Sequence, residues 1–194
     1  MTLGTLWLSR TRNQAVRILF CTIAFLVIYT ILHMIDHIAQ YVQRYMFGIW
    51  PAPALFQGLL NASDTTVHLW LNGIEYVAFI VLWFSFREAQ LKQSISTKLS
   101  PNKLKHLTIA ASAILFLVVF QTLHVIDHIV QYVQYYSLGI DPAPGVFQGL
   151  FSETDTVVHL WVNGAIILAV FMVWASLSAL QRWKIINPVV FSHE

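Results

Sequence analysis

Two stretches of twelve residues decide the fold: LHMIDHIAQYVQ at residues 32–43 and LHVIDHIVQYVQ at residues 123–134. Each places two histidines and an aspartate inside an otherwise apolar run. The sequence contains four apolar runs in all, at about 16–47, 65–86, 107–138 and 156–180. At a rise of about 1.5 Å per residue, each run is long enough for a helix to cross a hydrocarbon core of about 30 Å. The sequence therefore predicts an all-α integral membrane protein with four transmembrane helices.

The composition excludes an ordinary soluble domain. Of the 194 residues, 57% are hydrophobic and only 10% are charged, and the mean hydropathy is +0.65. A single cysteine, Cys21, lies in the first apolar run and excludes an internal disulfide. The lipid bilayer is thus the first partner that the sequence predicts.

The basic residues predict the orientation in the membrane. Ten of the eleven Lys and Arg residues lie before or at the start of the first run, between the second and third runs, or after the fourth, and only Arg44, near the end of the first run, lies on the other side. Because basic residues are enriched in cytoplasmic segments, we expect both termini and the middle loop to be cytoplasmic, in a bacterial or archaeal cytoplasmic membrane. The net charge of +2 is explained by this topology, and no basic surface indicates nucleic-acid binding.

The chain is a tandem duplication. A shift of 91 residues aligns residues 32–73 with residues 123–164 without a gap, and 28 of the 42 positions are identical. This predicts two helical hairpins, residues 1–95 and 96–194, that form a four-helix bundle with a pseudo-twofold axis along the membrane normal. In the loops, Gly48 and Gly139 are expected to follow the ends of helices.

Smaller features of each hairpin follow from the same alignment. Short interfacial helices are expected at residues 54–60 and 145–151. Ser63 or Asp64 should cap the second helix of the first hairpin, and Thr154 or Asp155 should cap its counterpart.

Six of the eight histidines lie in the duplicated segment. His33, Asp36 and His37 have i, i+3, i+4 spacing and project from one face of a helix, while His68 lies about one turn into the return helix. The second copy repeats this pattern with His124, Asp127, His128 and His159. Buried ionisable groups in a membrane need partners, and three imidazoles with a carboxylate are a suitable ligand set for a transition metal. The sequence predicts two mononuclear sites or one dinuclear centre near the outer face.

An alternative interpretation needs no metal. A hydrogen-bonded polar cluster, in which Asp36 holds a histidinium and Gln40 and Asn72 complete the network, would also satisfy these groups. In either case Asn72 and Asn163 are expected to orient the imidazoles. Glu75 has Ile166 as its counterpart, so it is not expected to belong to a duplicated site.

The metal and the reaction are less constrained. Imidazole ligands suit copper, iron and zinc alike, and haem is disfavoured because a third histidine and an aspartate lie at the same level. No nucleotide-binding loop or nucleophile motif is present, so no catalytic residue is assigned. The loops are short. The preferred hypothesis is a metal-bearing subunit of, or accessory to, a membrane oxidoreductase complex, or else a homo-oligomer. A stand-alone metalloenzyme (oxidoreductase or hydrolase) and a purely structural helical subunit are the alternatives.

Overall fold

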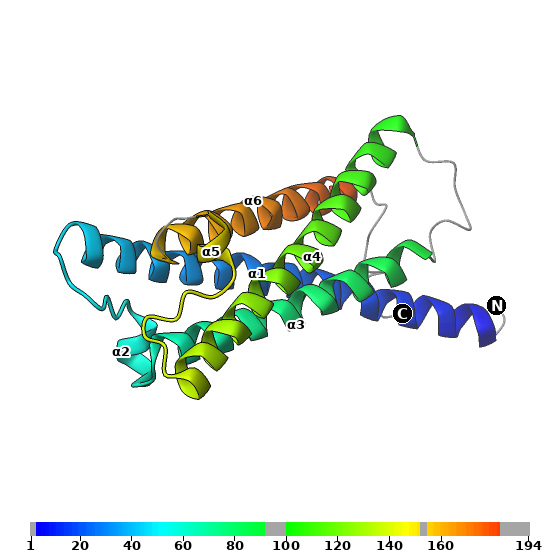
Figure 1. Ribbon diagram of the computed structural model, residues 1–194. Helices are drawn as coiled ribbons and strands as arrows, with labels where there is room; N and C mark the ends of the chain where they lie inside the picture. The colour runs from blue at the N-terminus through cyan, green and yellow to red at the C-terminus, as the bar shows by residue number, and fades with distance from the viewer. Residues whose placement is uncertain (1–2, 92–99, 152–154, 183–194) are drawn as a thin grey trace. The chain divides into compact units, whose positions relative to one another are not determined.

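The computed structural model describes residues 3–91, 100–151 and 155–182. Six helices follow one another along this part of the chain (Figure 1): α1 Leu3–Tyr45, α2 Phe56–Leu60, α3 Asp64–Leu91, α4 Pro101–Leu138, α5 Phe147–Phe151 and α6 Asp155–Arg182. The four long helices are each long and apolar enough to cross a membrane. The predicted all-α fold with four transmembrane helices is confirmed.

The ends of the helices follow from local sequence. Pro101 opens α4, where its missing N–H and fixed φ suit the first helical turn. Ser63 Oγ accepts a hydrogen bond from the backbone N–H of Thr66 at 3.3 Å and thereby caps α3. Of the two expected caps, the structure thus selects Ser63. Thr154, one of the two expected caps of α6, lies outside the described residues.

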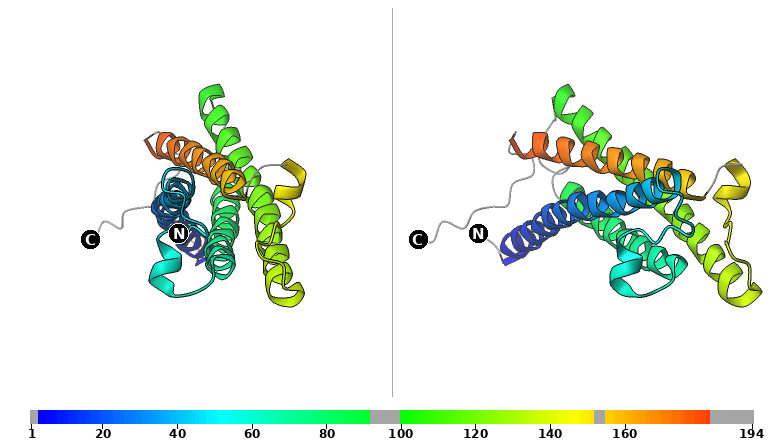
Figure 2. Two further views of the ribbon diagram at one scale, coloured as in Figure 1. Left: turned by 60° about the vertical axis from the view of Figure 1, so that its left-hand side comes forward. Right: turned by 90° about the vertical axis from the view of Figure 1, so that its left-hand side faces the viewer.

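The connections that follow α1 and α4 contain the glycines and short helices expected from the sequence. Gly48 and Gly139 have φ values of +65° and +66°, in the left-handed region where glycine is preferred. The short helices α2 and α5 lie within the predicted segments, in the two equivalent connections (Figure 2). The middle connection, residues 92–99, and the residues after 182 carry part of the predicted cytoplasmic charge and lie outside the described residues.

The helices contribute to two compact units. The apolar unit takes the described residues of Met1–Leu26, Ala78–Val118 and Ala169–Glu194, and the histidine unit takes those of Val27–Val77 and Val119–Leu168. In the apolar unit the fully buried side chains include Phe79, Phe86 and Leu177, and its buried polar residues among those described are Ser85 and Ser176. In the histidine unit, 16 polar or charged residues are buried. The two units therefore have different kinds of core.

The histidine unit is polar inside and apolar outside. Along α1, His33, Asp36 and His37 are buried, whereas Ile28 and Ile35 on the other face are 62% and 44% exposed. A soluble protein has the opposite arrangement. Exposed apolar side chains around buried ionisable groups are typical of a helix bundle in lipid.

Candidate metal centre

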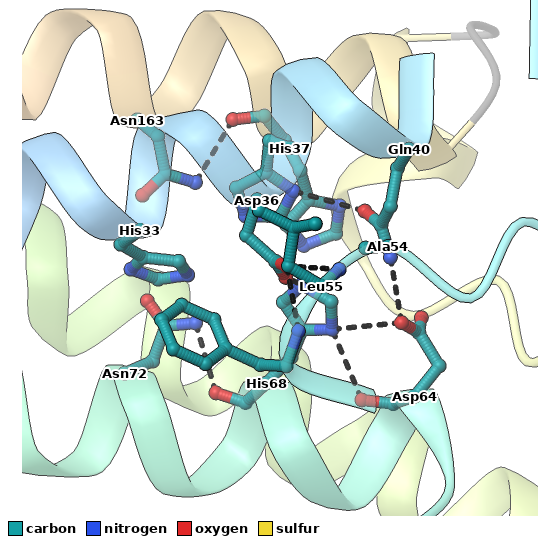
Figure 3. A network of polar contacts seen from close by, with 12 residues as sticks. His33, Asp36, His37, Gln40, Ala54, Leu55, Asp64, His68, Asn72 and Asn163 are labelled. Atoms are coloured by element: carbon teal, nitrogen blue, oxygen red, sulfur yellow. Dashed lines mark hydrogen bonds and ion pairs between the residues drawn. The ribbon is translucent and has the colours of Figure 1, made fainter. Parts of the chain in front are cut away.

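The first histidine triad consists of His33, His37 and His68. His33 and His37 are one turn apart on α1, and α3 brings His68 against them (Figure 3). All three are buried, and one ring nitrogen from each lies within 4.8 Å of the others. The ring centroids are 4.9 Å apart for His33 and His37 and 4.7 Å apart for His37 and His68. This triad can hold a metal ion.

The second triad consists of His124 and His128 from α4 and His159 from α6. Its ring nitrogens also lie within 4.8 Å of one another, and all three residues are buried. The Nε2 atoms of His124 and His128 are 3.1 Å apart and form a hydrogen bond. Two nitrogen ligands on one tetrahedral zinc ion, each at 2.0–2.1 Å, would lie roughly 3.3 Å apart. These two imidazoles are therefore close to the spacing that a shared ion requires.

The two triads are neighbours within the histidine unit. The ring centroids of His37 and His159 are 5.6 Å apart, and those of His68 and His128 are 5.8 Å apart. These separations are similar to those within a triad, so the six imidazoles form one continuous cluster. We call it the histidine cluster.

Hydrogen bonds orient the imidazole rings. Nδ1 of His37 lies 3.1 Å from Gln40 Oε1, and Nδ1 of His128 lies 2.7 Å from Gln131 Oε1. An amide oxygen can only accept, so in both rings Nδ1 must donate, and this assigns the lone pair to Nε2. The Nε2 of His37 is buried and has no hydrogen-bond partner. A ring held at Nδ1 with a free Nε2 lone pair has the usual arrangement of a metal-binding histidine.

His68 is held in the same way by other groups. Its Nδ1 lies 3.0 Å from the backbone oxygen of Asp64 and 3.2 Å from Asp64 Oδ1, while its buried Nε2 has no hydrogen-bond partner. Gln40 Nε2 donates to Asp64 Oδ1 at 2.6 Å (Figure 3). Asp64 and Gln40 therefore connect Nδ1 of His68 with Nδ1 of His37.

Asp36 and Asp127, the two predicted aspartate ligands, also bind the backbone of the loops. Asp36 Oδ1 accepts hydrogen bonds from the backbone N–H groups of Leu55 and Phe56 at 2.7 and 2.9 Å. Asp127 Oδ1 likewise accepts from Val146 and Phe147. Each carboxylate thus anchors the loop before a short helix and caps that helix. Metal coordination by Asp36 and Asp127 stays a prediction.

The other oxygen of each aspartate faces a histidine. Asp36 Oδ2 is 3.9 Å from His68 Nε2, and Asp127 Oδ2 is 3.8 Å from His159 Nε2. Gln43 and Gln134 complete the loop anchor, because their side-chain oxygens accept from the backbone N–H groups of Ala54 and Gly145 at 2.8 Å. Sequence reasoning missed these two glutamines, whose partners are backbone groups of a loop with no distinctive side chain.

The asparagines do not orient the imidazoles directly. Asn72 Nδ2 donates to the backbone oxygen of His68, and Asn163 Nδ2 donates to that of His159, both at 2.9 Å. The expected contact with the rings is replaced by a bond to the preceding helical turn. Each asparagine therefore fixes the helix backbone that carries the histidine.

Glu75 is the residue that sequence reasoning set aside. It is 1% exposed, and its Oε2 lies 3.5 Å from His33 Nδ1 and 3.3 Å from Gln121 Nε2. Gln121 Nε2 also contacts Asn72 Oδ1 at 2.9 Å. The spacing of His68, Asn72 and Glu75 on one helical face could have indicated that Glu75 lies near the histidines. Glu75 was set aside because it occurs in only one of the two copies.

A cavity of about 310 Å³ adjoins the histidine cluster within the histidine unit. Four of the six histidines contribute to its wall: His37, His68, His128 and His159. The two Pro-Ala-Pro segments supply Pro51, Ala52, Pro142 and Ala143. Both triads therefore border one space.

Comparison with protein-family models, with curated proteins and with solved structures finds no match to this chain.

Proposed function

We propose that this integral membrane protein binds two transition-metal ions side by side in the histidine cluster. His33, His37 and His68 hold one ion, and His124, His128 and His159 hold the other. The observation that carries the proposal is the convergence of three buried imidazoles in each triad. Copper, iron and zinc all suit such ligands.

The metal-free alternative leaves buried polar atoms without hydrogen bonds. The Nε2 atoms of His37 and His68 have no hydrogen bond, and neither does Asp36 Oδ2. A buried polar atom left unpaired costs about 1–3 kcal/mol. In a purely hydrogen-bonded cluster this cost would fall on several atoms at once, whereas a metal ion accepts the histidine lone pairs directly. This favours metal over a structural polar network.

Metal analysis of the purified protein tests the proposal. We expect about two ions per chain in the wild type, and none in the double variant His33→Ala with His124→Ala, since each triad then retains only two imidazoles. The variant His106→Ala is a matched control, because His106 lies on α4 in the apolar unit and outside both triads. A wild-type protein without stoichiometric metal, purified without chelators, would refute the proposal.

We further propose that the chain is a metal-bearing subunit of, or accessory to, a membrane oxidoreductase complex, with the histidine cluster near the outer face. The described loops are short, and apolar side chains such as Trp70, Val77 and Trp161 are over 60% exposed on the helices, where lipid or partner subunits can cover them. Recovery of the chain in a larger assembly after mild extraction supports this role. A monodisperse protein with turnover of its own would favour the stand-alone metalloenzyme instead.

The orientation has its own test. The charge distribution supports cytoplasmic termini and outer Pro-Ala-Pro loops. An impermeant thiol reagent applied from outside should modify a cysteine introduced at Leu55, which is 47% exposed, and should spare one introduced at Ser94. The reverse labelling pattern would place the histidine cluster at the cytoplasmic face.

A further inference from the structure

An ion held by either triad of the histidine cluster would lie beside the cavity. Each triad supplies three imidazoles, and a site with three protein ligands keeps one position for an exogenous molecule. His37 and His68 of the first triad line the cavity together with His128 and His159 of the second, and the Nε2 atoms of His37 and His68 have no hydrogen-bond partner. Each triad therefore contributes two of its histidines to the wall of the cavity.

The size of the cavity limits what can enter it. Its volume of about 310 Å³ is at the low end of the range of roughly 300–1,000 Å³ for small-molecule sites. The apolar part of the wall consists of prolines and alanines with Trp50 and Tyr135. This space suits a molecule of a few heavy atoms, not a lipid chain.

The wall is rich in hydrogen-bond acceptors. Gln57 Oε1 is buried and has no hydrogen-bond partner. Asp64 and Asp141 add carboxylates, and no Lys or Arg is found among the described residues that line the cavity. Arg44 lies nearby but stacks on Trp50 at 4.1 Å and donates to Thr156 Oγ1. An N–H or O–H group of a bound molecule would find acceptors here.

We infer, on the basis of the proposed function, that the cavity is a binding site for a small molecule that coordinates a metal ion through a lone pair and donates a hydrogen bond to Gln57. Water fits this description, and so do small alcohols and amines. The histidine cluster is then a reactive centre with an exogenous ligand, and not a closed structural metal site.

Two probe molecules test this inference. Imidazole and 1-methylimidazole offer the same kind of lone pair, but only imidazole retains an N–H donor. Each is titrated into the Co²⁺-loaded protein at a pH where it is neutral, and the visible spectrum of Co²⁺ reports the change in coordination. Because the two probes differ by one hydrogen bond, we expect imidazole to bind about three- to tenfold more tightly.

Substitutions at Gln57 and Ala143 test whether Gln57 is the hydrogen-bond acceptor and whether the probes bind in the cavity. Gln57→Leu should remove the preference for imidazole, while Gln148→Leu should retain it, because Gln148 is the counterpart of Gln57 in α5 and does not line the cavity. Ala143→Trp should fill the cavity and prevent both probes from binding, with Co²⁺ still bound. Ile74→Trp, at a position 46% exposed on α3 and outside the cavity wall, is the matched control for added bulk.

The outcomes separate this inference from the proposed function. If the wild type binds Co²⁺ but neither probe changes its spectrum, the ligand site is refuted and the metal proposal stands. Equal binding of the two probes would refute the donor requirement. If the protein binds no Co²⁺, the proposed function itself fails. Should Ala143→Trp fail to fold, the comparison of Gln57→Leu with Gln148→Leu still decides the inference.

Discussion

The two histidine triads have the same side chains and different surroundings. His33 in the first triad has the carboxylate of Glu75 at 3.5 Å from its Nδ1. The counterpart of Glu75 in the second copy is Ile166, which brings no carboxylate to His124. A carboxylate behind a metal-binding imidazole fixes the ring and makes it a stronger ligand. The two aligned segments thus carry equal sets of imidazoles, and one unmatched residue makes their surroundings unequal.

The largest expected effect comes from breaking one triad at a time. His68→Ala removes one imidazole from the first triad, and His159→Ala does so in the second. Because two imidazoles do not hold an ion as three do, each variant should lose one of the two ions, as measured by metal content per chain. If either substitution removed both ions, the triads would form a single site and the comparison between them would fail.

Glu75 provides the next largest effect. Glu75→Gln should lower the metal affinity of the first triad by about 10- to 100-fold, the usual result of losing a partner behind a histidine ligand. The affinity is measured by competition with a chelator, using His159→Ala protein, in which only the first triad binds. The same substitution in His68→Ala protein, where only the second triad binds, should have little effect.

A matched substitution checks that this effect is specific. Ile166→Leu changes the counterpart of Glu75 without adding a polar group, and it should leave the affinity of both triads unchanged. An equal loss of affinity at both triads after Glu75→Gln would show that Glu75 acts on the stability of the whole histidine unit and not through His33.

The spans, the two triads and the short helices could be predicted from the sequence. The spans follow from apolar run lengths, and the two triads follow from i, i+4 spacing with a return helix at the same level. The short helices could be placed because glycines and prolines limit where helices end. These features depend on local pattern alone, so no knowledge of packing is required.

Contacts between helices and loops could not be predicted in this way. The role of Glu75 depends on Gln121, which comes from α4, 46 residues further along the chain. The role of Asp36 depends on the path that brings the N–H groups of Leu55 and Phe56 to its carboxylate. Since many side chains could serve either purpose, only the packed structure identifies the ones that do.

A third prediction concerns the loop anchors, where the copies also differ. Gly145 has φ +64°, and a Cβ added there would lie 2.5 Å from Asp127 Oδ1. Gly145→Ala should therefore lower the free energy of unfolding by about 1–2 kcal/mol through left-handed strain alone, with a further loss from the displaced aspartate. Denaturation in detergent micelles measures it.

Gly164→Ala is the control for this substitution. Gly164 is helical, and the nearest atom to an added Cβ would be Met34 Cε at 3.8 Å, an ordinary contact. Alanine is favoured over glycine inside a helix by up to about 1 kcal/mol, so this variant should be as stable as the wild type or more stable. If both alanine variants behaved alike, the close approach at Gly145 would be irrelevant to stability.

The smallest effect is expected at the equivalent position of the first copy. Ala54 has φ +55° and is 8% exposed, in the place that Gly145 occupies in the second copy. Ala54→Gly relieves about 1–2 kcal/mol of left-handed strain, but it loses about 0.8 kcal/mol from the buried methyl group and about 0.4–1 kcal/mol from the greater freedom of the unfolded chain. These terms nearly cancel, so the free energy of unfolding should change by less than about 0.5 kcal/mol, while metal content stays at the wild-type value. A clear gain in stability would show that left-handed strain at Ala54 outweighs the packing of its methyl group. A clear loss would show that the packing of the Ala54 methyl group outweighs the strain.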